Sequence, residues 1–361
     1  PLSGTQREKR KGEYRYYGAQ GVIDYIDDYI FDGTFLLIAE DGENLKSKKQ
    51  NIAQVVNGQF WVNNHAHIVT GNDLCDTHYL CYLINSMDLS GYVTGSAQPK
   101  LSQANLNAVT LLLPRMEIQK KIVDYLRKID EKIELNTQIN KNLEQQAEAI
   151  FQSILSNAIT TVNLGEIADV KGGKRLPKGV NLTDIPNAHP YIRVRDLNNA
   201  LFASLTPNYA YVDKETQKSI SRYIVSTGDV LISIVGTIGL TAIVDSTLDK
   251  ANLTENCVKV TNLKHITPEY LLLYLRSQLG REAIAKGTVG AVQQKLPIKN
   301  IQAIPIPLLS EKDKNALFCT LDSIFAGISN NVIQSAKLAS LRDTLLPRLM
   351  SGELDVSDID L

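Results

Sequence analysis

Two long stretches of the chain carry apolar residues at the spacing of a coiled-coil helix. From Ile122 onward, and again from Leu317, these positions step by four and three residues. This spacing lines side chains along one helix face, as in an a/d seam. We predict two long helices, the first from residue 117 to about residue 157 and roughly 60 Å long at 1.5 Å per residue. The seam comprises Ile122, Leu126, Ile129, Ile133, Asn136, Leu143, Ile150 and Ile154, then Leu317, Leu321, Ile324, Ile328, Asn331, Leu338, Leu345 and Leu349.

The two helices belong to an internal repeat with an offset of 195 residues. Residues 95–109 (GSAQPKLSQANLNAV) match residues 290–304 (GAVQQKLPIKNIQAI), and the seam positions follow in the same register. Upstream of about residue 90 the register drifts, as loops of different length would cause. A repeat of this size predicts two copies of one domain, each followed by a long helix. Two helices with one apolar seam each are expected to pair antiparallel.

Asparagines interrupt both seams at equivalent positions. Asn136 corresponds to Asn331, and Asn140 corresponds to Ser335. A seam asparagine lowers stability but can fix register and orientation. Solvated positions on an irregular helix are the alternative, and the sequence leaves both open.

The expected fold class is α+β. Strand composition bounded by Gly, Asp and Asn occurs at residues 31–39, 55–64, 67–70, 190–194, 230–235 and 241–244, and short helices are expected at 77–86 and 268–277. We divide the chain into a first domain (1–113), a central helix (114–161), a second domain (162–306) and a C-terminal helix with a tail (307–361). The chain starts at Pro1, and its first domain lacks a counterpart of the strand expected at 162–170. We therefore expect an incomplete N-terminus.

The composition indicates a globular cytoplasmic protein. Hydrophobic residues make up 43% of the chain and charged residues 21%. The four cysteines are too scattered for a disulfide framework or a zinc site. We find no signal stretch, and the longest apolar run, residues 230–244, is shorter than the roughly 20 residues that span a bilayer. A buried strand, a glycine turn and a second strand explain this run, so we expect no membrane association.

Charge and motifs bear on function in different ways. The net charge is −1, which argues against a nucleic-acid partner, but residues 162–306 hold 17 basic and 12 acidic side chains. The sequence contains no phosphate-binding loop, no adjacent Pro pair of the kind adenine methyltransferases use, and no Ser, His and Asp set. His65, His67 and His78 do not complete a metal-ligand pattern. We predict a protein with no catalytic site, cofactor or metal of its own.

Three motifs resemble the specificity subunits of type I restriction-modification systems. They are residues 17–33 (YGAQGVIDYIDDYIFDG), residues 113–123 (LPRMEIQKKIV) and residues 345–354 (LLPRLMSGEL). The resemblance implies two target-recognition domains that read the halves of a split site in double-stranded DNA, with the helices as a spacer. It also implies two methyltransferase subunits as partners, with nuclease-translocase subunits attached to them, and it confines S-adenosylmethionine, ATP and Mg to those partners. Arg342 in place of the equivalent Ala147 departs from the repeat, as does the shift from Pro114 to Pro305 and Pro307.

Candidate DNA contacts follow from side-chain chemistry. Arginine pairs with guanine, Asn and Gln pair with adenine, and Lys contacts phosphate. Arg193 and Arg195, two residues apart, would project from one face of an extended segment. The candidates are Lys9, Arg10, Lys11, Lys46, Lys48, Lys49, Gln98, Lys100, Lys171, Lys174, Arg175, Lys178, Arg193, Arg195, Gln293, Gln294 and Lys295. A solvated surface is the alternative for each, and for the loops near Gln98 and Gln293 a shared packing role.

Two other function classes stay open. One is an enzyme whose site is assembled from scattered residues, which methylation by the purified chain alone would reveal. The other is a coiled-coil scaffold that has lost DNA recognition. A steep salt dependence of DNA binding by the assembled complex would argue against the scaffold.

Overall fold

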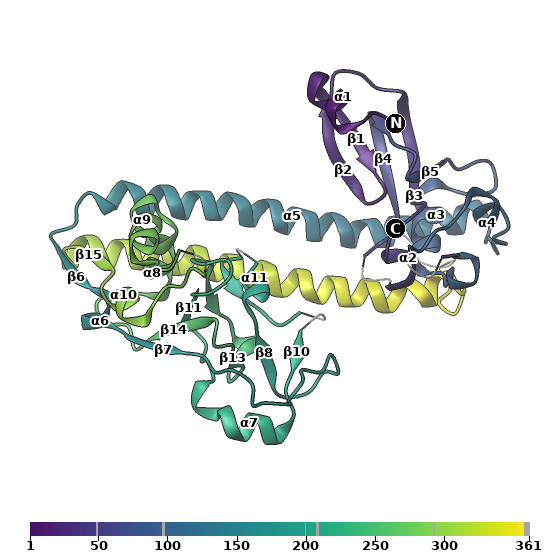
Figure 1. The fold of residues 1–361 in the computed structure, drawn as a ribbon. Coiled ribbons are helices and arrows are strands. Elements are labelled where there is room, and N and C mark those ends of the chain that lie inside the picture. Colours follow the sequence, from purple (N-terminus) through teal and green to yellow (C-terminus); the bar gives the residue numbers. More distant parts are fainter. Residues whose placement is uncertain (48–49, 96–97, 199, 207–208, 292, 357–361) are drawn as a thin grey trace. The chain divides into compact units, whose positions relative to one another are not determined.

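The computed structural model describes residues 1–361 except 48–49, 96–97, 199, 207–208, 292 and 357–361. The chain forms two compact units, and both contain parts of the same two long helices (Figure 1). Unit 1 consists of Pro1–Leu135 with Gln334–Leu361, and unit 2 is Asn136–Ile333. Each unit therefore joins one globular domain to one section of the helix pair.

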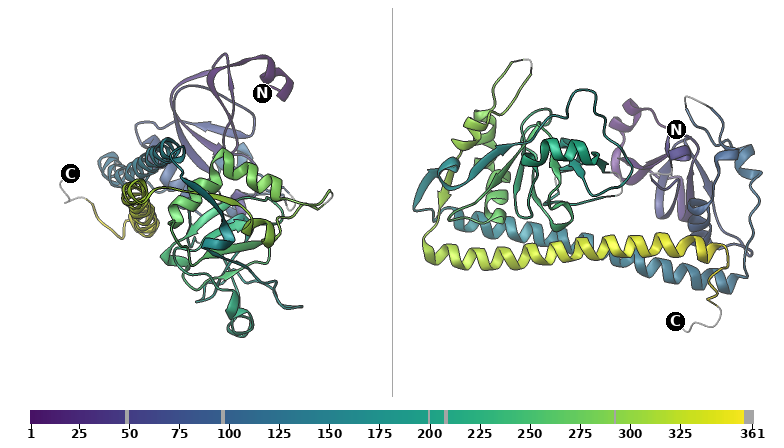
Figure 2. Two further views of the ribbon diagram at one scale, coloured as in Figure 1. Left: turned by 90° about the vertical axis from the view of Figure 1, so that its left-hand side faces the viewer. Right: turned by 90° about the horizontal axis from the view of Figure 1, so that it is seen from below.

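The long helices are α5, Met116–Leu155, and α11, Glu311–Met350, each of 40 residues. Both ends of α11 lie 195 residues beyond those of α5, so the helices follow the sequence repeat. Of the sixteen predicted seam side chains, seven are buried and nine are half-buried. Within each unit the first half of one helix lies beside the second half of the other, which makes the pair antiparallel (Figure 2).

Unit 1 is built on a five-stranded sheet in the order β2-β1-β4-β3-β5. Strand β4 is antiparallel to β3 and parallel to β1. The Asp76 side chain accepts hydrogen bonds from the first backbone N–H groups of α3 and so fixes where that helix begins. The elements are α1 Gly4–Lys9, β1 Lys11–Gly18, β2 Gly21–Ile26, β3 Phe31–Ala39, α2 Asn44–Ser47, β4 Ala53–Val62, β5 Ala66–Val69, α3 Thr77–Ser86, a 3-10 helix Ser90–Tyr92 and α4 Gln103–Asn107.

Unit 2 contains a five-stranded sheet, β7-β14-β11-β12-β9, with a three-stranded sheet, β10-β8-β13, and the pair β15-β6. The run at 230–244 folds as predicted, as β11, a turn and β12. The strands are β6 Thr160–Asn163, β7 Asp169–Gly172, β8 Pro190–Ile192, β9 Phe202–Ala203, β10 Ala210–Tyr211, β11 Val230–Ser233, β12 Thr241–Val244, β13 Asn252–Leu253, β14 Cys257–Thr261 and β15 Pro305–Leu308. The helices are α6 Leu164–Ile167, α7 Lys214–Ile220, α8 Pro268–Arg276, α9 Gln278–Gly287 and α10 Ile298–Gln302, with 3-10 helices Val194–Asp196, Ser221–Tyr223 and Ser246–Leu248.

The repeat continues upstream of residue 90, where the sequence register drifts. Ile38 pairs with Ala53 in the sheet of unit 1, and Ile232 pairs with Thr241 in the sheet of unit 2. Strand β3 therefore corresponds to β11, and the start of β4 corresponds to β12. Because the connecting loops differ in length, one fixed offset fails here, as expected.

Each unit has a core in which its helix section packs against its sheet and its short helix. In unit 1, Ile122 and Leu126 of α5 cluster with Leu349 of α11 and with Tyr79 and Leu83 of α3. In unit 2, Leu317, Leu321 and Ile328 of α11 cluster with Phe151 of α5 and with Tyr270 of α8. The sheet of unit 1 also has an aromatic core on its other face, which contains Tyr17, Phe31, Phe35 and Phe60.

The seam asparagines of unit 2 contact one another. Asn331 Nδ2 donates to Asn140 Oδ1 at 2.8 Å, and Asn140 Nδ2 donates to the Ile328 carbonyl at 3.4 Å. Asn136, whose exposed fraction is 0%, donates to the Asn331 carbonyl at 3.5 Å. These amides lie between the helices and bond across the pair.

Two local expectations are wrong. Residues 162–170 do not form one strand, because a turn of helix, α6, separates β6 from β7, with Asn163 and Glu166 forming a capping box at its start. Residues 193–195 are not extended either, because Val194–Asp196 is a 3-10 helix. Three residues per turn place Arg193 and Arg195 on different faces.

Helix α11 is the one helix in the described parts of the chain that is long and apolar enough to cross a membrane. One such helix is weak evidence for a membrane span, because the core helix of a soluble protein passes the same test. Leu317 and Leu321 of α11 lie in the core of unit 2.

Candidate nucleic-acid interface

Each unit presents one loop of the same construction. The backbones of Thr94 and Lys100 exchange two hydrogen bonds of 2.9 and 2.8 Å in unit 1, and those of Val289 and Lys295 exchange two of 2.9 Å in unit 2. We call residues 94–100 and 289–295 the paired loops.

Glycine is required at the second position of both paired loops. Gly95 has φ +86° and Gly290 has φ +106°, which are strained for residues with a side chain. A Cβ would also lie 2.3 Å from the Gln98 carbonyl oxygen in one loop and 2.4 Å from that of Gln293 in the other. The tight bend therefore places a glutamine at the same point of each loop.

A second shared contact holds the base of each loop. The Asn105 side chain in α4 donates to the Tyr92 carbonyl at 2.7 Å, and the Asn300 side chain in α10 donates to the Gly287 carbonyl at 2.7 Å. The loop backbone is thus anchored alike in both units, which is the packing role considered for the repeat. The side chains of Gln98, Gln293, Gln294 and Lys295 are exposed.

Other candidates near the first loop have internal partners. Lys100 forms an ion pair with Glu40 at 3.0 Å, and its side chain remains 55% exposed. Lys46 Nζ donates to the Gly95 carbonyl at 2.8 Å and so ties α2 to the loop. Lys48 and Lys49 lie outside the described residues.

The N-terminal basic run lies beside carboxylates. Arg10 pairs with Asp27 at 2.8 Å and with Asp28 at 3.2 Å, and Lys11 pairs with Asp24 at 2.6 Å. The hydrogen bond from Lys11 is the largest of the causes that hold the pKa of the Asp24 carboxyl below its usual value. Only Lys9 of the run is an exposed cation without such a contact in the described structure. The sequence contained the signal, because all three aspartates belong to the motif at residues 17–33.

The second domain presents a short basic loop after β7. The loop is anchored where the Gly173 backbone approaches that of Thr254, since a Cβ on Gly173 would lie 2.0 Å from the Thr254 carbonyl oxygen. Beyond the anchor, Arg175 is 81% exposed and pairs with Glu255 at 2.8 Å. Lys174 lies over the Tyr223 ring at 5.4 Å, and Lys178 is exposed.

Two further candidates of this domain have local roles in the structure. Lys171 lies in β7 and pairs with Asp169 at 3.0 Å. Arg193 is largely buried against Asp196, with a 2.9 Å contact that closes the 3-10 helix. Arg195, by contrast, is 70% exposed. The proposed arginine pair therefore separates into one structural residue and one exposed residue.

The histidines do not form a metal site. His65 Nδ1 lies 2.5 Å from Asp41, and His67 Nε2 lies 2.7 Å from the Leu101 carbonyl oxygen. No group of three or more His, Cys, Asp or Glu side chains suited to a metal ion occurs among the residues that the structure describes.

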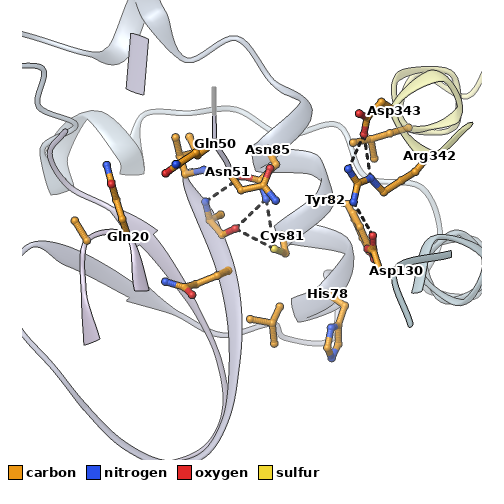
Figure 3. Close-up of a pocket in the computed structure, with 16 residues that line it drawn as sticks. Gln20, Gln50, Asn51, His78, Cys81, Tyr82, Asn85, Asp130, Arg342 and Asp343 are labelled. Carbon is orange, nitrogen blue, oxygen red and sulfur yellow. Dashed lines mark hydrogen bonds and ion pairs between the residues drawn. The ribbon is translucent and has the colours of Figure 1, made fainter. Parts of the chain in front are cut away.

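A polar network in unit 1 escaped the sequence reasoning. Tyr82 of α3 donates to Asp130 of α5 at 2.5 Å, and Arg342 of α11 contacts the same carboxylate at 2.7 Å (Figure 3). Burial and the Asp130 carboxylate raise the pKa of Tyr82, which keeps its hydroxyl protonated. The only sequence signal was Arg342 in place of the repeat's alanine.

Comparison with known proteins identifies the family. The model of the type I restriction modification DNA specificity domain matches residues 2–145 and 158–337. A Haemophilus influenzae protein whose name places it among type I restriction enzyme specificity subunits is 27% identical over 351 residues, with 91% of this chain and 84% of the relative covered. The MjaIX specificity subunit of Methanocaldococcus jannaschii is 23% identical, with coverage of 78% and 70%. The crystal structure of the S subunit of a type I system from M. genitalium has a TM-score of 0.60 at 15% identity, covers 97% of this chain and 91% of its own, and shows the fold.

The two matched segments correspond to the two copies of a mixed α/β domain, each with a forty-residue helix. The chain belongs to the family of type I restriction-modification DNA specificity proteins. The predicted family and fold class are thereby confirmed, as is the prediction of a DNA-recognition subunit rather than an enzyme. The choice of individual DNA contacts and the domain boundaries remain predictions.

Proposed function

We propose that this chain reads a bipartite site in double-stranded DNA, one half with each unit, and that the paired loops contribute base contacts. The observation that carries this is the duplicated loop itself, which presents Gln98 in one unit and Gln293 in the other on the same glycine bend. Glutamine can hydrogen-bond to the adenine edge in the major groove. Lys295, and Lys100 in competition with its ion pair to Glu40, would contact phosphate.

The second reading surface is the basic loop of unit 2, where Lys174, Arg175 and Lys178 are exposed. Arg175 already hydrogen-bonds to Glu255, so DNA would compete for a partly satisfied guanidinium. A surface of this kind contributes mainly through phosphate neutralisation, which weakens steeply with salt.

The helices and their flanks assemble with two methyltransferase subunits, to which nuclease-translocase subunits attach. S-adenosylmethionine, ATP and Mg are bound by those subunits, and the complex works in the cytoplasm. The relatives' names as subunits of type I restriction enzymes support the assembly with further subunits.

The test is to map methylated adenines in DNA from cells that contain this chain and its methyltransferase partner. We expect a split motif with a fixed unread gap that disappears when the chain is deleted. The double variant Gln98→Ala with Lys100→Ala should relax one half of the motif, and Gln293→Ala with Lys295→Ala should relax the other.

Lys141→Ala, on the exposed face of α5, is the control and should leave the motif unchanged. An undivided motif, or no motif at all, would contradict bipartite reading. Variants in both loops that relax the same half would contradict the assignment of one loop to each half-site.

A further inference from the structure

Unit 1 contains a cavity of about 730 Å³ beside the first half of strand β4. The start of β4, α3, and the sections of α5 and α11 that belong to unit 1 enclose it, together with Ala19 and Gln20 in the turn between β1 and β2 (Figure 3). The repeat offers a direct comparison, because unit 2 contains the corresponding elements.

The cavity lies along an open strand edge. Strand β4 pairs with β3 from Ala53 to Phe60, but on its other side it pairs with β1 only at Phe60, Trp61 and Val62. No strand in the described parts of the chain covers the other edge at residues 53–56. The Asn85 side chain of α3 takes up part of this edge, since it donates to the Ala53 carbonyl at 2.9 Å and accepts from the Ala53 N–H at 3.0 Å.

A strand fills the corresponding edge in unit 2. Val55 pairs with Leu36 as Ile243 pairs with Val230, so Val55 and Ile243 are equivalent. In unit 2, β9 lies parallel to β12 at this point, and the Ile243 N–H donates to the Leu201 carbonyl at 2.8 Å. In unit 1, among the described residues, the Val55 N–H contacts the thiol of Cys81, a weak acceptor whose pKa burial raises to about 12.

Loop length explains the difference. The Asn63 N–H donates to the Tyr17 carbonyl in unit 1, as the Thr254 N–H does to the Ile192 carbonyl in unit 2. Strand β1 therefore corresponds to β8, and β2 to β10. The link between β8 and β10, residues 193–209, is long enough to contain β9, whereas β1 and β2 are joined by a tight turn. Unit 1 keeps the slot but lacks the strand.

The side chains facing the slot differ in kind between the two units. In unit 2, Phe202 of β9 packs against Phe325 of α11, with ring centroids 6.0 Å apart. The repeat offset places Asp130 at the position of Phe325, and Asp130 lines the cavity in unit 1. The charged side chains of the lining are Asp130, Arg342 and Asp343, and Arg342 binds both carboxylates at 2.7 and 2.9 Å. Among the described residues of the lining, one negative charge is left in excess.

We propose that this slot receives an extended strand from another protein subunit of the complex, added parallel to β4, with a lysine or arginine at the position that Phe202 occupies in unit 2. The strand's backbone pairs with Val55, as β9 pairs with Ile243, and its cation reaches Asp130 and Asp343. Strand addition to an open edge is a common mode of peptide recognition, with backbone pairing for affinity and one side-chain pocket for specificity. The inference rests on the proposed function only in requiring that the chain assembles with protein partners.

The test is site-specific photo-crosslinking in the complete purified complex, with methyltransferase and nuclease subunits. Benzoylphenylalanine replaces Gln54, which lines the cavity, or, as the control, Gln59, which lies on the same strand beyond it. We expect light-dependent cross-linking from position 54, mapped by mass spectrometry to one segment of a partner subunit that contains a lysine or arginine. Position 59 should not give that product.

The charge requirement is tested with Asp343→Asn, which removes the excess negative charge and leaves the contact between Arg342 and Asp130 in place. The cross-link yield and the affinity for the partner should fall by about three- to ten-fold, while Asp343→Glu should restore them. Asp124→Asn, on the section of α5 that belongs to unit 1 but outside the cavity lining, is the charge control and should change neither.

The inference is overturned if position 54 cross-links to DNA or to a second copy of this chain, or gives no product in an assembled complex. An effect of Asp124→Asn equal to that of Asp343→Asn would also overturn the charge assignment. Mapping of methylated adenines with the same complex separates the two proposals. A normal split motif without the cross-link refutes only the strand slot, whereas a cross-link without any motif refutes only bipartite reading.

Discussion

The asparagines between the helices of unit 2 permit a quantitative test. The contact between Asn331 Nδ2 and Asn140 Oδ1, at 2.8 Å, has good hydrogen-bond length, whereas the two amide-to-carbonyl contacts are longer, at 3.4 and 3.5 Å. A typical hydrogen bond contributes about 0.5–1.5 kcal/mol net, and a buried polar group left without a partner costs about 1–3 kcal/mol.

We therefore expect Asn140→Ala and Asn331→Ala each to lower the free energy of unfolding of unit 2 by about 1–2 kcal/mol. The double variant should lose less than the sum, with a coupling energy of about 1 kcal/mol, because the second substitution removes a contact already broken. Replacing both residues with leucine should instead stabilise the helix pair, because apolar seam residues pack without desolvated amides. The same change should make the register of the two helices less well defined.

The assay is urea unfolding at 25 °C, followed by far-UV circular dichroism and by tyrosine fluorescence, with separate transitions fitted for the two units if both are seen. Gln145→Ala, on the exposed face of α5, is the control and should shift the free energy by less than about 0.5 kcal/mol. Additive effects, with coupling below about 0.3 kcal/mol, would refute the idea that these amides act as one unit.

Further substitutions test the core, the pH response and the loops. Phe325→Ala should cost unit 2 about 3–5 kcal/mol, because this ring is 2% exposed, whereas Leu341→Ala at a 48% exposed position should cost under about 0.5 kcal/mol by denaturant unfolding. Burial lowers the pKa of His78, so the unfolded chain binds its proton at higher pH than the folded chain does. The stability of unit 1 should therefore fall as pH drops below about 6.5, and His78→Gln should reduce this fall in melting temperatures measured from pH 7.5 to 5.5; an unchanged slope would contradict it. Gly95→Ala and Gly290→Ala force a residue with a side chain into a positive φ, and each should lower the DNA affinity of the complex by several-fold. Unchanged affinity in both variants would show that the loop bend is not needed for DNA recognition.

The helical part of the fold was the most predictable from sequence. The 4-3 spacing placed α5 to within two residues at each end, and the 195-residue offset predicted the second long helix, because seam periodicity is a local signal repeated over many turns. Strand β3 and helix α3 were also placed where the structure has them, since each carries its own boundary residues.

The failures arose where partners come from elsewhere in the chain. The basic run at residues 9–11 stays a predicted phosphate contact, but the sequence did not show that the sheet brings Asp24 and Asp27 beside Lys11 and Arg10. Arg193 was predicted on an extended segment, because the local sequence did not indicate that its side chain pairs with Asp196 at a 3-10 helix. Asp130 was not singled out as a site residue in the sequence, although it lines a cavity beside α3. Sequence periodicity gives the side of an element that is buried, but not the residue that will face it.

The compact units do not coincide with the repeated halves of the sequence. The boundaries between the units fall near the middle of α5 and of α11. The core of unit 1 is complete only when residues of α11 pack against α5, as Leu349 does against Ile122. A single proteolytic cut after α5 would therefore divide the chain into two fragments without releasing either, because noncovalent packing inside unit 1 still joins them. The two fragments would therefore stay associated through the core of unit 1 although the backbone is cut.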